Sequence, residues 1–457
     1  MIKIKYIYDQ SREQSGTLVS TENAMLRKPK VYLSTKFIKT YALETNTLTI
    51  KIGNWSKEFI IKTNRHIPAH IVGLAKNDMP FQLPDDFSYE IRVEENTLHI
   101  GPIIAFMAQN RLQDLTVKKL EQYRSYFKNY TSIRGLIFVC AIDSVNINNE
   151  TMIGYYYNPS AKTPKNRWKK EIFPYPDSLY KKIKTPLNIQ QSLKSALGNR
   201  IFNTNYFNKL DFWNVCSLNN KTKNLLPHTK VFRSIEDLEE MVYKYDKVYV
   251  KPIEGMQGNG ILFVKRKDNG ILVINKEKKE RFFTSKKTAA LYFNKILTRK
   301  SGYLVQQAIV TLYKEHQVDF RLYFQKDQTK QWICQGAVGR FAQQKSIVTN
   351  FKHLDKLYKG TQALQLLFNV EEAAANKMMN KAIQACREIC ETIDNELGQF
   401  GDFAIDIIID EHQKPWILEV NSGVYGCKSL RVLKDYKTLS KIRTTPFQFA
   451  KTLAGFQ

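Results

Sequence analysis

Two apolar segments near the C-terminus carry oxygen-bearing side chains that could bind a cation. Asp406 lies inside the run 403–410, and Glu419 and Asn421 stand at the end of the run 416–421. Runs rich in isoleucine and valine predict buried strands, on which residues two apart share a face. A carboxylate buried in a strand is costly unless it is paired or bound to a cation. These hard oxygen atoms suit Mg²⁺. The alternative is a strand end at which Glu419 and Asn421 simply reach solvent.

A glycine-rich segment lies upstream and follows a predicted strand at 248–253. Its glycines, Gly255, Gly258 and Gly260, precede a second strand pattern. Because glycine has no Cβ, such a turn brings backbone N–H groups close to an anion, and Lys251 stands where an ammonium could reach a phosphate. The segment is neither a P-loop nor a dinucleotide fingerprint, since it lacks Gly-Lys-Ser/Thr and no helix follows it. Taken alone, it would equally fit a plain hairpin turn.

Two arginines lie on predicted strands between these segments. Asp319–Phe324 contains Arg321, and Gly336–Phe341 contains Arg340. An arginine on an apolar strand needs an anionic partner, and phosphates or carboxylates bind a guanidinium through two parallel hydrogen bonds. The alternative is a pair of internal salt bridges. The short apolar segment 303–309, just before these strands, is of the kind that lines an adenine slot.

The order of these motifs resembles that of ATP-grasp enzymes. Strand lysine, glycine loop, apolar hinge segment, Asp-x-Arg strand, Gly-Arg strand and a final Asp…Glu-x-Asn follow one another from about Phe202 onward. In particular, the chain resembles the YheC/YheD endospore coat-associated group of Bacillus-type bacteria. Leu98–Ile104 and Leu226–Thr229 are similar to signatures of that group. The resemblance implies an ATP-grasp fold of two α+β lobes that close on the nucleotide.

The resemblance also implies roles for individual residues. The strand lysine would contact the phosphates of ATP, the glycines would form the mobile loop that covers them, and the hinge would receive adenine. The implied nucleotide-binding set is Lys251, Gly255, Gly258, Gly260, Gln306, Gln307 and Ile309. A further lysine normally precedes the small lobe, and the candidates are Lys209 or, as the alternative, Lys230. The implied Mg²⁺ ligands are Asp406, Glu419 and Asn421, and Arg321 and Arg340 would hold the transferred phosphoryl group or the substrate carboxylate.

Members of the family usually activate a carboxylate as an acyl phosphate, which an amine or a thiol then attacks. Phosphoryl transfer needs positioning and charge neutralisation and no protein nucleophile. The chain fits this because it has no Gly-x-Ser-x-Gly elbow. We therefore expect an ATP- and Mg²⁺-dependent ligase. The rivals are a kinase on the same fold and, in a different class, a structural protein of the spore coat that binds ATP without turnover.

Composition sets further limits. A chain of 457 residues is too long for one compact core and predicts two or three domains. No run approaches the ~20 apolar residues of a membrane span, and the N-terminus lacks the apolar core of a signal peptide. The six cysteines are scattered without metal-binding spacing, and Cys386 and Cys390 are expected to be core neighbours on a helix. Free thiols indicate a reducing cytoplasm, and the resemblance adds an association with the spore coat.

The net charge is strongly positive, with 70 lysines and arginines against 43 acids and a formal charge of +27. Such a field attracts polyanions. Nucleic acid is not the expected partner, because no helix-turn-helix or RNP-like motif accompanies the basic clusters. An acidic amino acid or peptide as the carboxylate substrate would use this charge, as would docking on spore coat proteins.

The predicted architecture is α+β and α/β with several domains. Residues 1–108 are expected to form a β-rich N-terminal domain, 109–200 a small α/β domain that precedes the grasp lobes, and 201–457 the ATP-grasp domain, with its small lobe at about 230–305. A helix is expected at 117–129 and a long amphipathic helix at 370–397. His66, His70 and His99 are interpreted as structural or surface residues.

Overall fold

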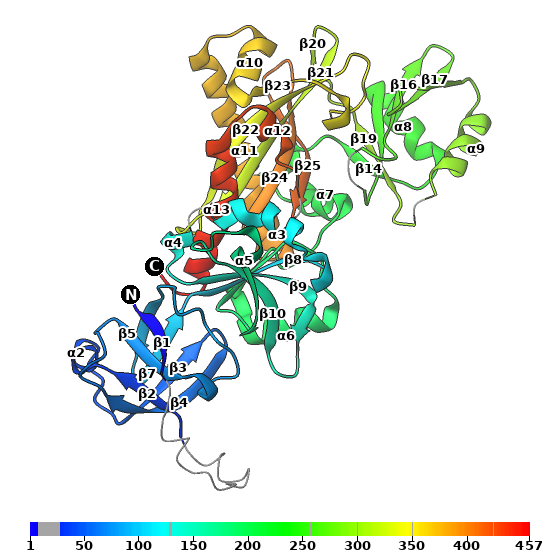
Figure 1. Ribbon diagram of the computed structural model, residues 1–457. Coiled ribbons are helices and arrows are strands. Elements are labelled where there is room, and N and C mark those ends of the chain that lie inside the picture. Colours follow the sequence, from blue (N-terminus) through cyan, green and yellow to red (C-terminus); the bar gives the residue numbers. More distant parts are fainter. Residues whose placement is uncertain (8–27, 128–129, 256–257, 299, 350, 424) are drawn as a thin grey trace. The chain divides into compact units, whose positions relative to one another are not determined.

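The structure is a computed structural model of the 457-residue chain (Figure 1). It describes residues 1–7, 28–127, 130–255, 258–298, 300–349, 351–423 and 425–457. The chain divides into two compact units. Unit 1 comprises Met1–Asn203, Asp327–Lys330 and Arg443–Gln457, and unit 2 comprises Thr204–Lys326 and Gln331–Ile442.

Unit 1 begins with a seven-stranded sheet in the order β1-β5-β2-β4-β3-β7-β6. Its turn at Gly53–Asn54 joins two alternating strands, as the sequence pattern predicts, and Leu48, Ile50 and Ile52 are fully buried on one face. The elements are β1 (Lys3–Ile7), β2 (Lys30–Leu33), α2 (Thr35–Thr40), β3 (Thr47–Ile52), β4 (Trp55–Thr63), β5 (Ile71–Ala75), β6 (Glu90–Glu94) and β7 (Thr97–Gly101).

A second, six-stranded sheet completes unit 1, in the order β11-β10-β9-β8-β12-β13, and mixes parallel with antiparallel pairs. Its elements are β8 (Ile103–Gln109), α3 (Val117–Tyr123), α4 (Tyr130–Ile133), β9 (Leu136–Asn146), β10 (Thr151–Tyr157), α5 (Pro164–Arg167), β11 (Trp168–Pro174), β12 (Ser178–Lys181), α6 (Leu187–Leu197) and β13 (Ile201–Phe202). The expected helix at 117–129 is shorter than predicted, because α3 passes at Arg124 into a 3₁₀ turn.

The first sheet of unit 2 has the order β14-β19-β15-β16-β17-β18. One of its faces packs against two helices through a small apolar core that includes Leu238, Val250 and Phe293. The elements are β14 (Thr229–Phe232), α8 (Ile235–Tyr245), β15 (Lys247–Pro252), β16 (Leu262–Lys267), β17 (Gly270–Asn275), β18 (Glu280–Phe283), α9 (Lys286–Ile296) and β19 (Tyr303–Gln307).

The second sheet of unit 2 has the order β23-β22-β21-β24-β25, with β20 paired to β21. One face packs on α7, α10 and α11, where Cys386 and Cys390 lie in the core as expected. The elements are α7 (Lys209–Leu218), β20 (Leu312–Tyr313), β21 (His316–Lys326), β22 (Trp332–Ala342), β23 (Leu354–Lys359), α10 (Gly360–Phe368), α11 (Glu372–Leu397), β24 (Asp402–Ile409), β25 (Pro415–Ser422), α12 (Lys428–Val432) and α13 (Tyr436–Leu453).

The mixed α and β architecture with several sheets is confirmed. The C-terminal residues from Arg443 onward group with unit 1, although they follow unit 2 in the sequence. Phe447, Phe449 and Ala450 belong to the core of unit 1. Within the described ranges, no helix has both the length and the apolar character needed to span a membrane.

Candidate functional site

The site is built on the face of β21, β22, β24 and β25 that lies opposite α10 and α11. Strand alternation sends Phe320 and Leu322 into the helix-covered core and Asp319, Arg321 and Tyr323 to the other face. The facing strands follow the same rule, and Arg321 stands opposite Asp406 across β21 and β24. The predicted strands therefore bring together residues that are far apart in sequence.

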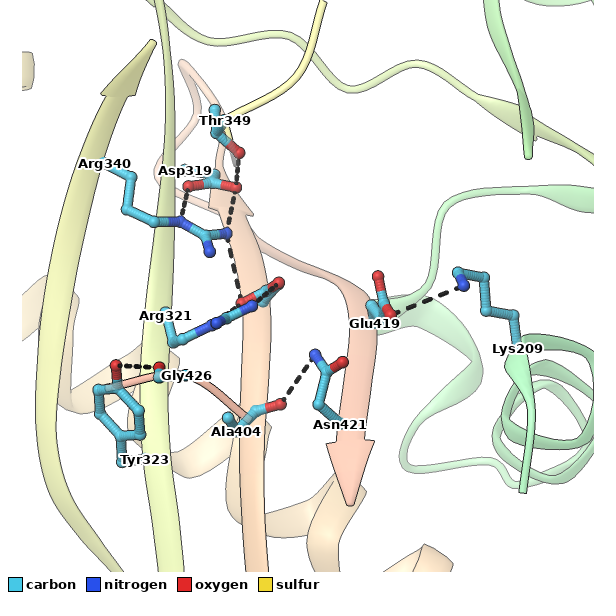
Figure 2. A network of polar contacts seen from close by, with 11 residues as sticks. Lys209, Asp319, Arg321, Tyr323, Arg340, Thr349, Ala404, Glu419, Asn421 and Gly426 are labelled. Carbon is cyan, nitrogen blue, oxygen red and sulfur yellow. Dashed lines mark hydrogen bonds and ion pairs between the residues drawn. The ribbon is translucent and has the colours of Figure 1, made fainter. Parts of the chain in front are cut away.

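Four side chains on this face form a row of alternating charge (Figure 2), made of Arg321, Asp406, Arg340 and Asp319. Nε and Nη2 of Arg321 donate to the two carboxylate oxygens of Asp406, each at 2.7 Å. Arg340 binds Asp319 in the same two-pronged way, at 2.6 and 2.5 Å, and its Nη2 lies 3.3 Å from Oδ1 of Asp406. Thr349 donates its hydroxyl to Asp319. Both arginines thus form internal salt bridges with carboxylates, which is the alternative that the sequence left open.

Burial of this network strengthens the effect of each charge on the pKa values of its neighbours. The side chains of Arg340 and Asp319 are 8% and 5% exposed. Burial alone would raise the pKa of Asp406, but the charges of Arg321 and Arg340 outweigh it and lower the pKa to about 2. Asp406 is therefore a permanent anion near neutral pH, held between two permanent cations.

The three predicted metal ligands lie on two adjacent strands. Asp406 stands opposite Glu419, and Ala404 stands opposite Asn421, so all three ligand side chains share one face. Asn421 donates its Nδ2 to the carbonyl of Ala404 at 3.4 Å, which leaves the amide oxygen for another partner. Asp406 accepts two N–H groups of Arg321 and lies 3.3 Å from Nη2 of Arg340, whereas a carboxylate offers about four acceptor positions. Two carboxylates and an amide oxygen are a donor set that fits Mg²⁺.

Lys209 approaches this row from the start of α7. Asn208 caps the helix by accepting the N–H groups of Leu210 and Asp211, which fixes Lys209 as the first helical residue. Its Nζ lies 3.7 Å from Oε1 of Glu419 (Figure 2) and donates to the carbonyl of Gly255 at 3.0 Å. The lysine therefore joins the acidic row to the glycine segment.

The alternative lysine lies elsewhere. Lys230, on β14, forms an ion pair with the exposed Glu240 on α8. Of the two candidates, Lys209 is the one that the structure brings beside Glu419.

The glycine segment connects β15 to β16 as an antiparallel hairpin. Gly258 and Gly260 have φ angles of +69° and +81°, which L-residues with a Cβ rarely adopt. Residues 256–257 lie outside the described part of the chain. The hairpin predicted from the glycines is present, and its backbone conformation requires glycine at two positions.

Lys251 leads into this hairpin and belongs to a second polar cluster. Its Nζ donates to Oε1 of Gln306 at 2.6 Å, and Nε2 of Gln306 donates to the hydroxyl of Thr229 at 3.0 Å. Burial lowers the pKa of Lys251 to about 8. Next to Gln306, Gln307 exchanges hydrogen bonds with the backbone of His228.

Ile309 is buried after the end of β19, at 9% exposure. Together with Lys251, Gln306 and Gln307 it forms the predicted hinge and strand-lysine group, which the fold places on and after two paired strands, β15 and β19.

Two members of the network were not selected from the sequence. Asp319 holds Arg340, and Thr349 holds Asp319. Asp319 could have been found, because it precedes Arg321 by two residues and so shares its face. Thr349 lies in a loop with no periodic signal.

In a comparison with known proteins, residues 198–453 match the family model described as YheC/D-like ATP-grasp. The endospore coat-associated protein YheD of Bacillus subtilis is 26% identical over 365 residues, covering 74% of this chain and 76% of YheD. The endospore coat-associated protein YheC of the same organism is 23% identical over 241 residues, covering 51% of this chain and 63% of YheC.

Two solved structures are similar to this chain at lower sequence identity. D-alanyl-alanine synthetase A from Vibrio cholerae has a TM-score of 0.43 at 10% identity, covering 76% of this chain and 98% of that one. D-cycloserine synthetase DcsG has a TM-score of 0.42 at 11% identity, covering 77% and 99%. The family match alone spans more than half of the 457 residues. The chain therefore belongs to the YheC/D-like ATP-grasp family and has the ATP-grasp fold that its motif order predicts.

Proposed function

We propose that this protein is an ATP- and Mg²⁺-dependent ligase that joins a carboxylate to an amine or a thiol. The observation that carries the proposal is the row of Asp406, Glu419 and Asn421 beside two buried arginines, in a chain of the ATP-grasp family. The set combines cation ligands with anion-binding groups on one face of one sheet. Phosphoryl transfer requires these two kinds of group and little else.

Both arginines keep donors for a substrate. The bonds of Arg321 and Arg340 to carboxylates use Nε and Nη2. Within the described ranges, no hydrogen bond reaches Nη1 of either side chain. Each guanidinium would therefore bind an anionic oxygen of the substrate or of the transferred phosphoryl group through Nη1. Asp406 and Asp319 would hold them in place for this.

Asp406, Glu419 and Asn421 would hold Mg²⁺. The ion, when bound, neutralises negative charge on the phosphate oxygens of ATP. Lys209 would share this task from α7, because its ammonium already contacts Glu419 and the glycine segment.

The nucleotide would lie along β15 and β19. Lys251 would contact its phosphates, and Gly255, Gly258 and Gly260 would cover them. Gln306, Gln307 and Ile309 would receive adenine, with part of the recognition through backbone groups.

The reaction would proceed in two steps. An oxygen of the substrate carboxylate attacks the γ-phosphorus of ATP, the bond from that phosphorus to the β,γ-bridging oxygen breaks, and ADP leaves. The nitrogen or sulfur of the acceptor then attacks the acyl carbon of the resulting acyl phosphate. Inorganic phosphate leaves with the electron pair of the carbon–oxygen bond, and the acceptor loses its proton. No side chain of the protein becomes covalently bound in either step.

The carboxylate substrate is proposed to be an acidic amino acid or peptide. The net charge of +27 attracts such a molecule and would make its binding weaken with salt. Binding that does not change between low and high salt would contradict this assignment. The proposed location is the cytoplasm, with association to the spore coat, because the similar protein YheD is endospore coat-associated.

A second candidate is a coat-assembly role in which ATP binds without turnover. The descriptions of YheD and YheC as endospore coat-associated favour it. The test is ADP release with Mg²⁺ and hydroxylamine, using pooled amino acids and acidic peptides. The intact chain is compared with the Asp406→Ala/Glu419→Ala variant.

The ligase predicts ADP release that depends on one pool and disappears in the variant, together with a hydroxamate, because hydroxylamine traps an acyl phosphate. ADP without hydroxamate would indicate a kinase. Nucleotide binding without ADP from any pool would contradict the ligase and favour the assembly role.

A further inference from the structure

The first sheet of unit 1 has a polar face that its core does not explain. On β3, Leu48, Ile50 and Ile52 enter the core, so Thr49 and Lys51 point to the opposite face. Lys51 is half-buried there. A polar face of a sheet is normally open to solvent, but here Arg200 and the segment Leu453–Gly455 cover part of it.

A row of polar residues crosses four strands on this face. Lys51 stands opposite Ser56 of β4 on one side and opposite His99 of β7 on the other, and His99 stands opposite Arg92 of β6. The next row along the strands contains Thr49, Thr97 and Glu94. Register alone therefore assembles a set of hydrogen-bonding groups on adjacent strands.

Both rows line a cavity of about 670 Å³. Its remaining walls include Arg200 and the segment Leu453–Gly455. Arg92 ties that segment down by donating to the carbonyl of Gly455 at 3.0 Å. Pockets that hold small molecules typically measure roughly 300–1,000 Å³, so this cavity has the size of a ligand site.

The cavity lining has three cations, Lys51, Arg92 and Arg200, against two acids, and Lys51 lies near Glu94 without an ion pair between them. Arg200 donates to the backbone carbonyls of Ala196, Leu197 and Asp177, and neither Arg200 nor Lys51 forms an ion pair with any residue that the structure describes. Hydrogen bonds to carbonyls orient a guanidinium without cancelling its charge.

The acids bordering the cavity do not balance this charge. Glu94 is bound to Arg92, and Glu95 is exposed in the turn after β6. Lys51 and Arg200 are therefore left for an incoming anion.

His99 completes the site. Its Nε2 lies 2.6 Å from Oδ1 of Asp177, whose other oxygen accepts the N–H of Ile103. The His99 side chain is only 10% exposed, and its ring packs edge-on against Phe456. An imidazole fixed in this way is a rigid hydrogen-bonding group on the cavity wall.

We propose that this cavity binds a small anion bearing carboxylate or phosphate oxygens, at a site separate from the ATP-grasp residues. Guanidinium and ammonium groups supply charge-assisted hydrogen bonds to such oxygens, and the hydroxyls of Ser56, Thr49 and Thr97 supply further polar contacts. The proposal does not depend on the ligase activity, because every residue in it belongs to unit 1.

The test is isothermal titration calorimetry of the full chain with citrate, L-glutamate and inorganic phosphate in separate titrations. We expect one of them to bind with a stoichiometry of one, and the anion that binds distinguishes carboxylate from phosphate recognition. Lys51→Gln should weaken that binding about tenfold or more, because it removes a charged hydrogen-bond donor. Lys62→Gln on β4 is the control, since this exposed lysine does not line the cavity, and it should change nothing.

A second variant guards against a folding defect. Ser56→Trp fills the cavity from an exposed position without changing charge, and it should also abolish binding while the thermal midpoint is retained. The proposal is overturned if none of the three anions binds. It is equally overturned if Lys51→Gln and Lys62→Gln weaken binding alike, or if Ser56→Trp leaves it intact.

Discussion

Asp406 is the residue on which the candidate site depends most. It accepts hydrogen bonds from Arg321, forms an ion pair with Arg340, and faces the Glu419 position across the strand pair. A buried ion pair is costly to assemble, and removing one partner leaves the other charge uncompensated. The residue is thus expected to contribute to stability and to cation binding at once.

Replacing Asp406 with asparagine should therefore lower the free energy of unfolding by about 3 kcal/mol. The pKa of Asp406 is about 2, below its ordinary value of 3.8. Its stabilising contribution is thus complete above pH ~4 and is lost as the pH falls toward 2. Urea denaturation of the wild type and the variant between pH 2 and 7 measures this.

Asp355→Asn is the matched control for that experiment. Asp355 has a side chain 38% exposed and lies 3.7 Å from Nδ1 of His316. It should change stability by less than about 0.5 kcal/mol. Equal effects of the two variants would mean that the buried network adds no stability.

Lys251 leads to a prediction about nucleotide binding. Its pKa is about 8 because burial disfavours the charged form. If the lysine contacts phosphates, affinity for a non-hydrolysable ATP analogue should be level below pH 8. Above pH 8 it should fall by up to about tenfold per pH unit, since binding then requires uptake of a proton. Calorimetry between pH 6.5 and 9.5 gives the profile.

The Lys251→Arg variant tests the cause. Arginine stays protonated throughout this range, so the decline above pH 8 should disappear. A decline that persists in the variant would assign the titration to another group.

At the residue scale, sequence reasoning identified the charged side chains but not all their partners. That Arg321 and Arg340 need anions follows from chemistry. The 85-residue separation of Arg321 from Asp406 hides their pairing, which arises only from the register of β21 on β24. Likewise, the sequence leaves Lys209 and Lys230 as alternatives, and only the structure brings Lys209 beside Glu419.

At the scale of elements, the sheet under the site is held by very close packing of α10. A Cβ added to Gly339 on β22 would lie 2.2 Å from the Cβ of Ala363 on α10. Gly339→Ala should therefore push the helix away from the strand and destabilise unit 2 by about 1–3 kcal/mol. Thermal denaturation of the variant checks this. Gly426→Ala is the control, since a Cβ there meets nothing within 4 Å, and a similar loss in both variants would contradict the packing argument.

The glycine hairpin is a second element with a testable requirement. Alanine at Gly258 and Gly260 would have to adopt left-handed φ angles, at a cost of about 1–2 kcal/mol each. The double variant should weaken binding of the ATP analogue roughly tenfold, because the loop relaxes away from the conformation that presents its N–H groups.

The matched control for the hairpin is Gly198→Ala. Gly198 also has a positive φ, of +54°, with open space around it, but it lies in unit 1. The variant likewise places a Cβ at a positive φ, but away from the hairpin, and it should leave nucleotide affinity unchanged. Equal loss in both variants would mean that the hairpin has no specific role.

Element types were largely predictable and their ends less so. The strands around Asp406 and the glycine hairpin follow from apolar runs and turn residues. The prediction made the helix at 117–129 too long, because helical periodicity continues through Arg124–Phe127, where the structure has a 3₁₀ turn. Local periodicity does not distinguish these two helix types.

At the scale of the whole molecule, unit 1 contains residues from both ends of the sequence. Phe447 is 1% exposed and contacts the rings of Phe106, Phe127 and Tyr180. Phe447→Ala should destabilise unit 1 by about 3–5 kcal/mol. Hydrogen exchange followed by mass spectrometry should then show lost protection in residues 100–200 and retained protection in residues 331–420.

Tyr436→Ala is the control for this prediction, since Tyr436 starts the same helix but is 60% exposed. Protection lost equally across both units would mean that they unfold as one.

The assignment of α13 to two units could not come from the sequence. Its sequence pattern predicts an apolar stripe, but the pattern does not identify the core against which each part of the stripe packs. Leu439 and Ile442 join the small core of Tyr323 and Ala404, on the same face of the sheet as the site, whereas Phe447 and Ala450 join unit 1. The boundaries at 108 and 200 remain predictions, and only the grouping of distant segments required coordinates.

This discontinuity has a consequence for synthesis. A ribosome releases residues 1–203 long before residues 443–457 are made, at a rate of roughly 5–20 residues per second. For that interval the emerging chain lacks Phe447 and Phe449, and the aromatic surface that they cover stays accessible to chaperones or to other nascent chains. Unit 1 completes its core only after the whole of unit 2 has been translated.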